Sequence, residues 1–293
     1  MITKPDYEDN VDLILHRGFF CLDKPRGPTS HECSAFVKNI LKVSKTGHTG
    51  TLDADVSGVL PVLLNESVKA THFLSSQPKT YVCYMKTEKP FKQKELEQIF
   101  NNFKGRIFQK PPLASAVAKK MRVRTVYSLD LLEVDGKDVL FKARTEGGTY
   151  IRNLVRDSGY LLNSENEMTE LRRIESLGVL EDSCFTLQDL SDAFWLYEEK
   201  KKTSELLKMV KPLEELVKLP RIMIDDDAVK PVSTGSDLFS PGIVEMDDFS
   251  ENELVSIVDS KGFIRCFGKT LISSKKAHSI SKGVVVDIER VLI

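Results

Sequence analysis

Two aspartates, Asp53 and Asp55, are the residues of this chain whose type and setting most suggest chemistry. Gly47, Gly50 and Gly58 surround them, and glycines let a backbone turn tightly and present a side chain outward. A carboxylate presented in this way could act as a nucleophile, a general base or a metal ligand, and the spacing does not choose among these roles. A plain surface loop with two solvated aspartates is the alternative that composition favours. The segment lacks the lysine of a phosphate-binding P-loop, which excludes that motif.

A second candidate is a basic stretch between Lys104 and Arg124, where seven Lys and Arg residues occur over 21 positions without one acidic residue. Apolar residues such as Phe108 and Met121 are interleaved with them. This pattern predicts a loop that contacts phosphates, and a solvated basic face is an equally weighted alternative. The net charge of −1 hides this stretch, because residues 221–293 hold nine basic and twelve acidic residues and residues 1–220 hold 33 and 31.

A third candidate is the glycine turn Gly147-Gly148, which leads into Thr149-Tyr150-Ile151-Arg152 at the expected start of a helix. An arginine at that place could pair with a carboxylate or a phosphate through its planar fork. A surface arginine at an ordinary helix entry is the equal alternative. Leu171-Arg172-Arg173 is a weaker signal on its own.

Hydrophobic periodicity predicts the elements that must position these residues. Helices are expected at 30–41, where Thr29 and Glu32 have the spacing of a capping box, at 92–103 and at 151–162. Residues 191–219 are expected to be charged and helical, with a new helix at Pro212. Strands are expected at 19–22, 59–64, 81–85, 126–134 and 139–143, the last two joined by a hairpin turn at 135–137. Short β-segments at 255–258, 263–267 and 283–288 predict a small barrel-like module, with a domain boundary near 215–220.

Composition excludes several classes of protein. Hydrophobic residues make up 41% of the 293 residues, and no apolar run is long enough to cross a membrane. The charged N-terminal residues are not typical of a secretory signal. Five scattered cysteines and five histidines show no spacing typical of a disulfide framework or a metal site, so we expect a reducing compartment and no metal.

Taken in order, these segments resemble the TruB/dyskerin family of pseudouridine synthases. The motifs that carry the resemblance are Leu22-Asp23-Lys24-Pro25, Thr29-Ser30-His31, Gly47-His48-Thr49-Gly50-Thr51-Leu52-Asp53, Gly58-Val59-Leu60-Pro61-Val62, Lys79-Thr80-Tyr81, Gly148-Thr149-Tyr150-Ile151-Arg152 and Glu170-Leu171-Arg172-Arg173. The segment from Gln109 to Val117, followed by Arg122-Val123-Arg124, resembles the dyskerin branch. The chain departs from the family at Ala54, Ser57 and 163–168, where Pro, Thr and a glycine-rich turn are usual.

The C-terminal part is similar to a PUA domain, an RNA-binding module, through Leu219-Pro220, Gly235-Ser236-Asp237-Leu238, Pro241-Gly242-Ile243 and 282–287. The resemblance implies an α+β fold: a catalytic domain at 15–217 whose mixed, largely antiparallel sheet is flanked by helices, and a β-barrel-like PUA domain at 220–293. It leaves residues 1–14 as an extension, which we expect to pack on the PUA domain.

The resemblance implies a pseudouridine synthase that needs no cofactor, with catalytic residues Asp53, Tyr81 and Arg152. Asp53 would act at the sugar or on the base, and a covalent and a glycal route both stay open. Arg152 would hold Asp53 ionised, Tyr81 would stack on the flipped base, and Lys24-Pro25 would support the Asp53 loop. Tyr150, Leu171 and His48 are the expected pocket residues. The residues expected to bind RNA are Lys110, Lys119, Lys120, Arg122, Arg124 and Arg173.

The expected partners are a guide RNA of the box H/ACA type, a substrate rRNA or tRNA, and the small protein subunits of that ribonucleoprotein, with no membrane. Two alternatives remain: a stand-alone enzyme for uridine 55 of tRNA, and a catalytically silent RNA-binding scaffold. The presence of Asp53, Tyr81 and Arg152 together counts against the scaffold. A cytoplasmic location is expected, or a nucleolar one in a eukaryotic source.

Overall fold

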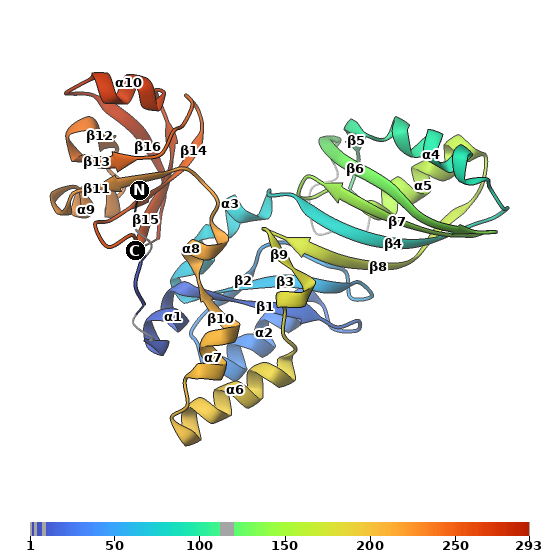
Figure 1. The fold of residues 1–293 in the computed structure, drawn as a ribbon, viewed down its shortest axis with the longest axis horizontal. Coiled ribbons are helices and arrows are strands. Elements are labelled where there is room, and N and C mark those ends of the chain that lie inside the picture. The colour runs from blue at the N-terminus through green and yellow to red at the C-terminus, as the bar shows by residue number, and fades with distance from the viewer. Residues whose placement is uncertain (1, 3–4, 8–9, 112–119, 293) are drawn as a thin grey trace.

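The computed structural model of the chain describes residues 2, 5–7, 10–111 and 120–292. Figure 1 shows three regions in a row: a C-terminal β-module, a central region with β1, β3 and α2, and a long arm built from β4 to β8 with α4 and α5. The central region therefore joins two β-rich ends.

One large mixed sheet runs through the central region and the arm of the described chain. Its strand order is β10-β1-β3-β8-β4-β7-β6-β5, with β2 beside β3 and β9 beside β8. All these neighbours are antiparallel except β3 and β8. The strands are β1 (Gly18–Lys24), β2 (Thr46–His48), β3 (Ser57–Leu64), β4 (Lys79–Thr87), β5 (Gly105–Gln109), β6 (Arg122–Asp135), β7 (Asp138–Thr145), β8 (Asn166–Ser176), β9 (Val179–Leu180) and β10 (Val210–Pro212).

Helices cover this sheet. Those predicted at 30–41, 92–103 and 151–162 are confirmed with small changes at their ends, whereas the stretch predicted as helical at 191–219 is interrupted by the strand β10. The helix α2 (Ser30–Leu41) carries the predicted capping box between Thr29 and Glu32. The others are α1 (Val11–Arg17), the 3₁₀ turn η1 (Asn65–Ala70), α3 (Thr71–Ser75), α4 (Gln93–Asn102), α5 (Ile151–Leu162), η2 (Glu181–Ser183), α6 (Leu187–Lys200), α7 (Ser204–Met209) and α8 (Leu213–Leu216). The helix α1 was not predicted, because its seven residues are too few for a clear periodicity.

The C-terminal module is a second sheet of six strands within the described residues, in the order β12-β16-β15-β14-β11-β13. This confirms the expected small, barrel-like β-module. Its elements are β11 (Arg221–Ile224), α9 (Asp226–Ser233), β12 (Leu238–Phe239), η3 (Ser240–Gly242), β13 (Ile243–Met246), β14 (Leu254–Val258), β15 (Ile264–Thr270), α10 (Ser274–Ser279) and β16 (Val284–Val291).

Alternation along the central strands divides the apolar interior into separate cores. Phe20 and Leu22 of β1 face the core shared with α2 and α6, whereas Phe19 and Cys21 face the core that continues into the C-terminal module. The arm has its own core, formed by β4, β6 and β7 under α4 and α5. Both faces of β1 are therefore covered, and β1 pairs with β3, the strand into which the loop after β2 leads.

The N-terminal segment lies against the C-terminal module. The phenol of Tyr7 donates to Glu214 at 2.7 Å, and its ring packs edge-on against Phe263 with 5.3 Å between centroids. The guanidinium of Arg17 donates to the carbonyl of Ile264 at 2.5 Å. Burial raises the pKa of the Tyr7 phenol and lowers that of the Arg17 guanidinium, which places both groups in a joint largely shielded from water.

Candidate active site

Backbone contacts hold the Asp53 loop between β2 and β3 at several points. The hydroxyl of Ser30, the first residue of α2, donates to the carbonyl of Leu52 at 2.9 Å and accepts from the Leu52 amide at 2.7 Å. On the other side of Asp53, the buried ammonium of Lys24 donates to the carbonyls of Ala54 and Val56 at 3.3 and 2.8 Å. The support expected of Lys24 is therefore present. Asp53 lies between two fixed neighbours.

The partner of Asp53 is Arg152, in the first turn of α5. Tyr150 is the residue before this helix, and it is held by reciprocal bonds with Gln109: its amide donates to the Gln109 side chain at 2.9 Å, and its carbonyl accepts from that side chain at 3.1 Å. The guanidinium of Arg152 forms an ion pair with the Asp53 carboxylate. The two side chains are 44% and 51% exposed, so the pair is open at the surface of a cleft and is not sealed in the core.

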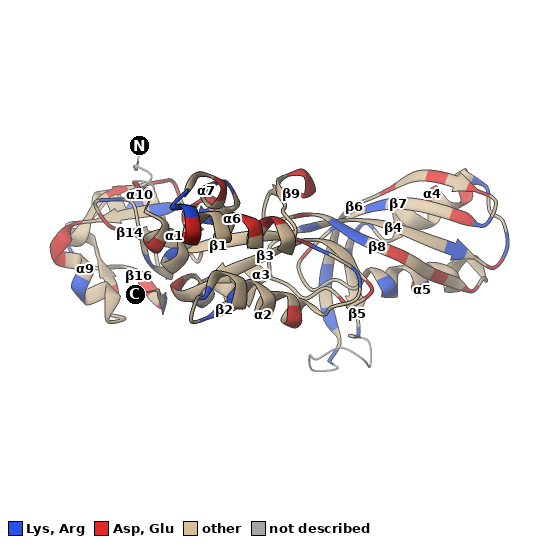
Figure 2. Ribbon diagram, turned by 90° about the horizontal axis from the view of Figure 1, so that it is seen from below, with Lys and Arg blue, Asp and Glu red and all other residues tan. Residues whose placement is uncertain are grey.

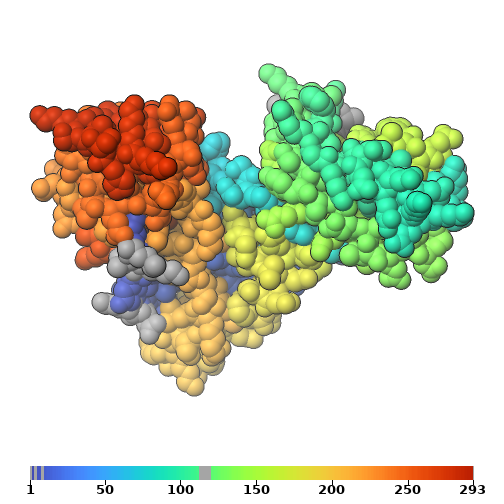
Figure 3. Space-filling model, turned by 45° about the horizontal axis from the view of Figure 1, so that its top comes forward, coloured from blue at the N-terminus to red at the C-terminus, as the bar shows by residue number. Residues whose placement is uncertain are grey.

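This cleft has a volume of about 910 Å³. Asp53, Arg152, Tyr81, Tyr150 and Leu171 all line it, so the structure brings together five of the six residues expected to form the catalytic centre and its pocket. The C-terminal module contributes one wall of the cleft through Asn252, Leu254, Lys269 and Glu289. Residues of α3 and its C-cap also line it: His72, Phe73, Ser75 and Ser76. Figure 3 shows this hollow between the red C-terminal module and the green arm.

The sixth expected pocket residue, His48, does not line the cleft. It is the last residue of β2 and is half buried, with Nδ1 enclosed and without a hydrogen-bond partner in the described structure. Burial, and then the positive charges near it, lower the pKa of its imidazole, so His48 is neutral at neutral pH. Its position fits support of the loop better than contact with a base.

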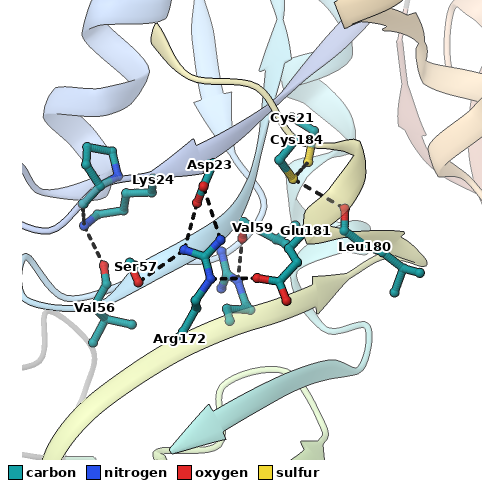
Figure 4. Close-up of polar contacts among 12 residues, drawn as sticks. Cys21, Asp23, Lys24, Val56, Ser57, Val59, Arg172, Leu180, Glu181 and Cys184 are labelled. Atoms are coloured by element: carbon teal, nitrogen blue, oxygen red, sulfur yellow. Dashed lines mark hydrogen bonds and ion pairs between the residues drawn. The ribbon is translucent and has the colours of Figure 1, made fainter.

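The strand β8 presents consecutive side chains to opposite faces, as a strand must. Leu171 and Arg173 line the cleft, whereas Arg172 points to the other side. There Arg172 holds both oxygens of Asp23 at 3.0 and 3.2 Å and donates to Glu181 at 2.7 Å (Figure 4). Arg172 therefore ties β8 to β1 and to η2.

Arg173 requires a correction, because we expected it to bind RNA. Its side chain is fully buried and donates to the carbonyl of Val59 at 2.7 Å and to that of Gly50 at 3.1 Å. Gly58 makes this close approach possible: its φ is +107°, and a Cβ there would lie 2.1 Å from the carbonyl oxygen of Arg173. Arg173 is a structural cation beneath the loop, and sequence alone does not distinguish it from its neighbour Arg172, which pairs with Asp23 and Glu181 on the other face.

A second buried cation, Lys79, lies beside Gly50. Its ammonium donates to the carbonyls of Ser75 and Gln77, each at 2.9 Å, at the end of α3. Burial, together with the nearby guanidinium of Arg173, lowers the pKa of Lys79 to about 7. Lys79 also lines the cleft and begins the strand that carries Tyr81, so it links α3, the loop and β4. In the sequence, Lys79 was indicated only as part of the motif Lys79-Thr80-Tyr81, one of those that carry the family resemblance.

The remaining residues expected to bind RNA differ in their surroundings. Lys110 and Lys120 are exposed, and Arg122 is half buried and lines the cleft. Arg124 also lines the cleft, but it is paired with Glu146 at 3.2 Å. Lys119 lies outside the described residues. In Figure 2 the blue basic positions of this region lie on the arm, along β5 and β6.

The basic stretch is not a continuous loop, which corrects our expectation. Residues 105–109 form β5 and pair with the first part of β6, in register from Gly105 with Val126 to Gln109 with Arg122. Interleaved apolar residues such as Ile107 pack against the core of the arm, and this alternation is the strand signal that the charges obscured. Ser30, Gln109 and the cleft residues of the C-terminal module were also not predicted as site residues, because their roles depend on contacts distant in sequence.

None of the helices in the described part of the chain is long and apolar enough to cross a membrane.

Comparison with known proteins gives matches along nearly the whole chain. Residues 38–151 match the family described as TruB family pseudouridylate synthase (N terminal domain), residues 152–218 match the tRNA pseudouridylate synthase B C-terminal domain, and residues 220–292 match the PUA domain. A protein of Archaeoglobus fulgidus named probable tRNA pseudouridine synthase B is 41% identical over 285 residues, which is 97% of this chain and 88% of that protein. One of the same name from Methanocaldococcus jannaschii is 40% identical over 97% of this chain and 85% of its own length.

Solved structures agree in fold. A Cbf5-Nop10-Gar1 complex contains a chain that superposes with a TM-score of 0.91 and 37% identity, covering 100% of this chain and 90% of the other. The archaeal box H/ACA sRNP Nop10-Cbf5 complex matches with a TM-score of 0.88 and 35% identity, covering 100% and 93%. An H/ACA RNP bound to a substrate RNA containing 2′-deoxyuridine matches with a TM-score of 0.88 and 36% identity, covering 97% and 87%.

Proposed function

The chain belongs to the TruB family of pseudouridine synthases, which isomerise uridine in RNA, and from this we propose that Asp53 performs the reaction in the cleft beside β8. The observation that carries the proposal is the ion pair between Asp53 and Arg152, open to a cleft that Tyr81 and Leu171 also line. We take residues 15–217 as the catalytic domain and 220–293 as the PUA domain. The family matches at 38–151 and 220–292 support this division.

The reaction breaks the bond between C1′ of the ribose and N1 of uracil and forms one between C1′ and C5. The base gains a proton at N1 and loses one from C5, so no oxidant or cofactor is needed. The target uridine must leave its stack to reach the cleft, at a cost of a few kcal/mol. In our proposal Tyr81 and Leu171 enclose the extruded base, Asp53 acts at the sugar or the base, and Arg152 keeps the carboxylate oriented.

We propose further that the chain acts within a box H/ACA ribonucleoprotein, where a guide RNA selects the uridine. The support is the match over 97–100% of the chain to solved structures: two are named as complexes of Cbf5 with Nop10, one of them also with Gar1, and the third is named as an H/ACA RNP bound to a substrate RNA. The geometry fits an RNA held at two places, because the C-terminal module supplies one wall of the cleft that contains Asp53. The basic residues Lys110, Lys120 and Arg122 would contact its phosphates.

A second candidate is stand-alone modification of tRNA, which the names of the curated relatives favour. Co-purification of the tagged full chain, followed by sequencing of the bound RNA, separates the two. A small RNA complementary to rRNA around one unpaired uridine, together with small protein subunits, is expected from the guided enzyme. Conversion of a naked tRNA transcript by the purified chain at the rate of the assembled particle would overturn guided action.

A further inference from the structure

Two thiols, those of Cys21 and Cys184, lie in direct contact. The sulfurs of Cys21, in β1, and Cys184, after η2, are 3.3 Å apart and share a hydrogen bond. Figure 4 shows both side chains pointing toward each other beside the Arg172 network. The other three cysteines of the chain, Cys33, Cys83 and Cys266, are buried elsewhere.

The backbone fixes this pairing of thiols. The amide of Phe185 donates to the carbonyl of Cys21 at 3.0 Å, and the amide of Asp23 donates to the carbonyl of Phe185 at 2.9 Å. Leu22 and Phe185 thus form a parallel bridge, which places Cys184 beside Cys21. A disulfide needs the sulfurs about 2.05 Å apart, so each has to move only about 0.6 Å to close the bond.

We propose that Cys21 and Cys184 are a redox modification site, at which a hydroperoxide converts the two thiols into a disulfide that joins β1 to the segment before α6. This site does not depend on the proposed function, because the disulfide is detected as a covalent link between two peptides and not through enzyme activity. Two reasons favour a site over two core thiols that simply pack together: the backbone register already aligns the sulfurs, and one of them is reachable from solvent.

The two cysteines have different surroundings, and this sets the order of the steps. Cys184 is only partly buried, so its thiolate attacks the hydroperoxide: an S–O bond forms, the O–O bond breaks, and the leaving oxygen takes a proton from solvent and departs as water or an alcohol. Cys21 is 3% exposed, and its hydrogen bond with Cys184, then burial, raise the pKa of its thiol. Cys21 therefore acts second: its thiol gives up its proton, its sulfur attacks the sulfenic sulfur of Cys184, the S–O bond breaks, and the sulfenic oxygen leaves with that proton as water.

The residues next to Cys21 give the bond a structural consequence. Asp23 holds Arg172, and Lys24 holds the carbonyls on both sides of Asp55 in the catalytic loop. On the other segment, Glu181 holds the same Arg172. A disulfide would join these two supports of Arg172 covalently. We expect the oxidised chain to unfold at a higher temperature than the reduced one, because the crosslink restricts the unfolded chain.

The test uses the reduced full chain treated with hydrogen peroxide, alkylated, digested without reductant and analysed by mass spectrometry. We expect one linked peptide pair containing Cys21 and Cys184, lighter by two hydrogen atoms, with the other cysteines still alkylated. Dithiothreitol should restore both thiols. The Cys21→Ser variant should stop at a sulfenic acid on Cys184, which dimedone traps, and the matched Cys83→Ala variant should form the link as the natural chain does.

Three results would overturn the proposal: sulfinic or sulfonic acid on Cys184 without a link in the natural chain, a link only between two chains, or a lower unfolding temperature after oxidation. The experiment on the natural chain decides the matter even if a cysteine variant fails to fold. A loss of pseudouridine synthase activity alone would bear on the proposed function and not on this site.

Discussion

The carboxylate of Asp53 and the guanidinium of Arg152 form an ion pair although 99 positions separate them in the chain. One comes from a loop pinned by Ser30 and Lys24, and the other from the first turn of α5, which Gln109 holds through Tyr150. The loop between β2 and β3 thus meets the helix α5 of the arm at this pair. The predictions below test it and its supports.

Asp53→Asn should reduce pseudouridine formation by about 10³-fold or more, because the amide can neither attack nor accept a proton as the carboxylate does. RNA binding and thermal stability should stay near those of the natural chain, since the side chain is half exposed. Asp55→Asn is the matched control, two positions along the same loop and outside the cleft lining. Turnover near the natural level in Asp53→Asn would refute its catalytic role.

Arg152→Lys should lower turnover by about 10²-fold, because a flexible ammonium does not reproduce the planar fork that orients the carboxylate. Single-turnover assays at saturating RNA should place the loss in the chemical step. Arg156→Lys is the control on the same helix, since Arg156 pairs with its neighbour Asp157 at 2.8 Å. Equal effects of the two substitutions would show that the Asp53 pair has no special role.

Lys79 should make stability depend on pH. Its native pKa of about 7 lies below the ordinary 10.5, so above pH 7 the unfolded chain binds one more proton at this site than the native chain. The free energy of unfolding should therefore gain up to about 1.4 kcal/mol per pH unit from Lys79 as pH rises from about 7 to 8.5. Below the native pKa both states are protonated and this dependence vanishes.

Chemical denaturation of Lys79→Met across this range should lack that contribution to the slope. Lys86→Met is the control, because Lys86 is an exposed residue of the same strand. Identical slopes for the natural chain and Lys79→Met would mean that Lys79 keeps its proton in the folded state.

Arg122→Gln should weaken RNA binding and reduce the dependence of log K on log[salt] by about one, because one phosphate contact is lost. Arg173→Met should instead lower the unfolding temperature, since it leaves the carbonyls of Gly50 and Val59 without their buried donor. Binding titrations at several salt concentrations separate the two. If a folded Arg173→Met chain also showed a reduced dependence of log K on log[salt], Arg173 would be an RNA contact after all.

Local signals in the sequence were sufficient to predict the helices and strands, but they did not predict which side chains are buried. The capping box at Thr29 and the periodicity after Tyr150 predicted α2 and α5 with their observed ends, because caps and amphipathic stripes are local. The resemblance to a family indicated Asp53 and Arg152. The exposure of Arg173 was mispredicted because it depends on Gly58, distant in sequence, which allows β3 to approach β8.

The path of the basic stretch was mispredicted for a similar reason: the pairing of β5 with β6 is a contact that charge composition does not report. The C-terminal wall of the cleft has no local signal either. It results from how the module is seated against the N-terminal segment at Tyr7 and Arg17.

The alternation of β8 places three tasks on three successive positions: a cleft wall at Leu171, an interstrand tie at Arg172 and a buried cation at Arg173. Shifting a strand by one residue exchanges its two faces. A single residue deleted upstream in β8 would therefore put the guanidinium of Arg172 where the apolar wall stands, and a single residue inserted there would leave Asp23 opposite the aliphatic side chain of Leu171. The pairing of β8 with β3 on one side and β4 on the other holds these three positions in register.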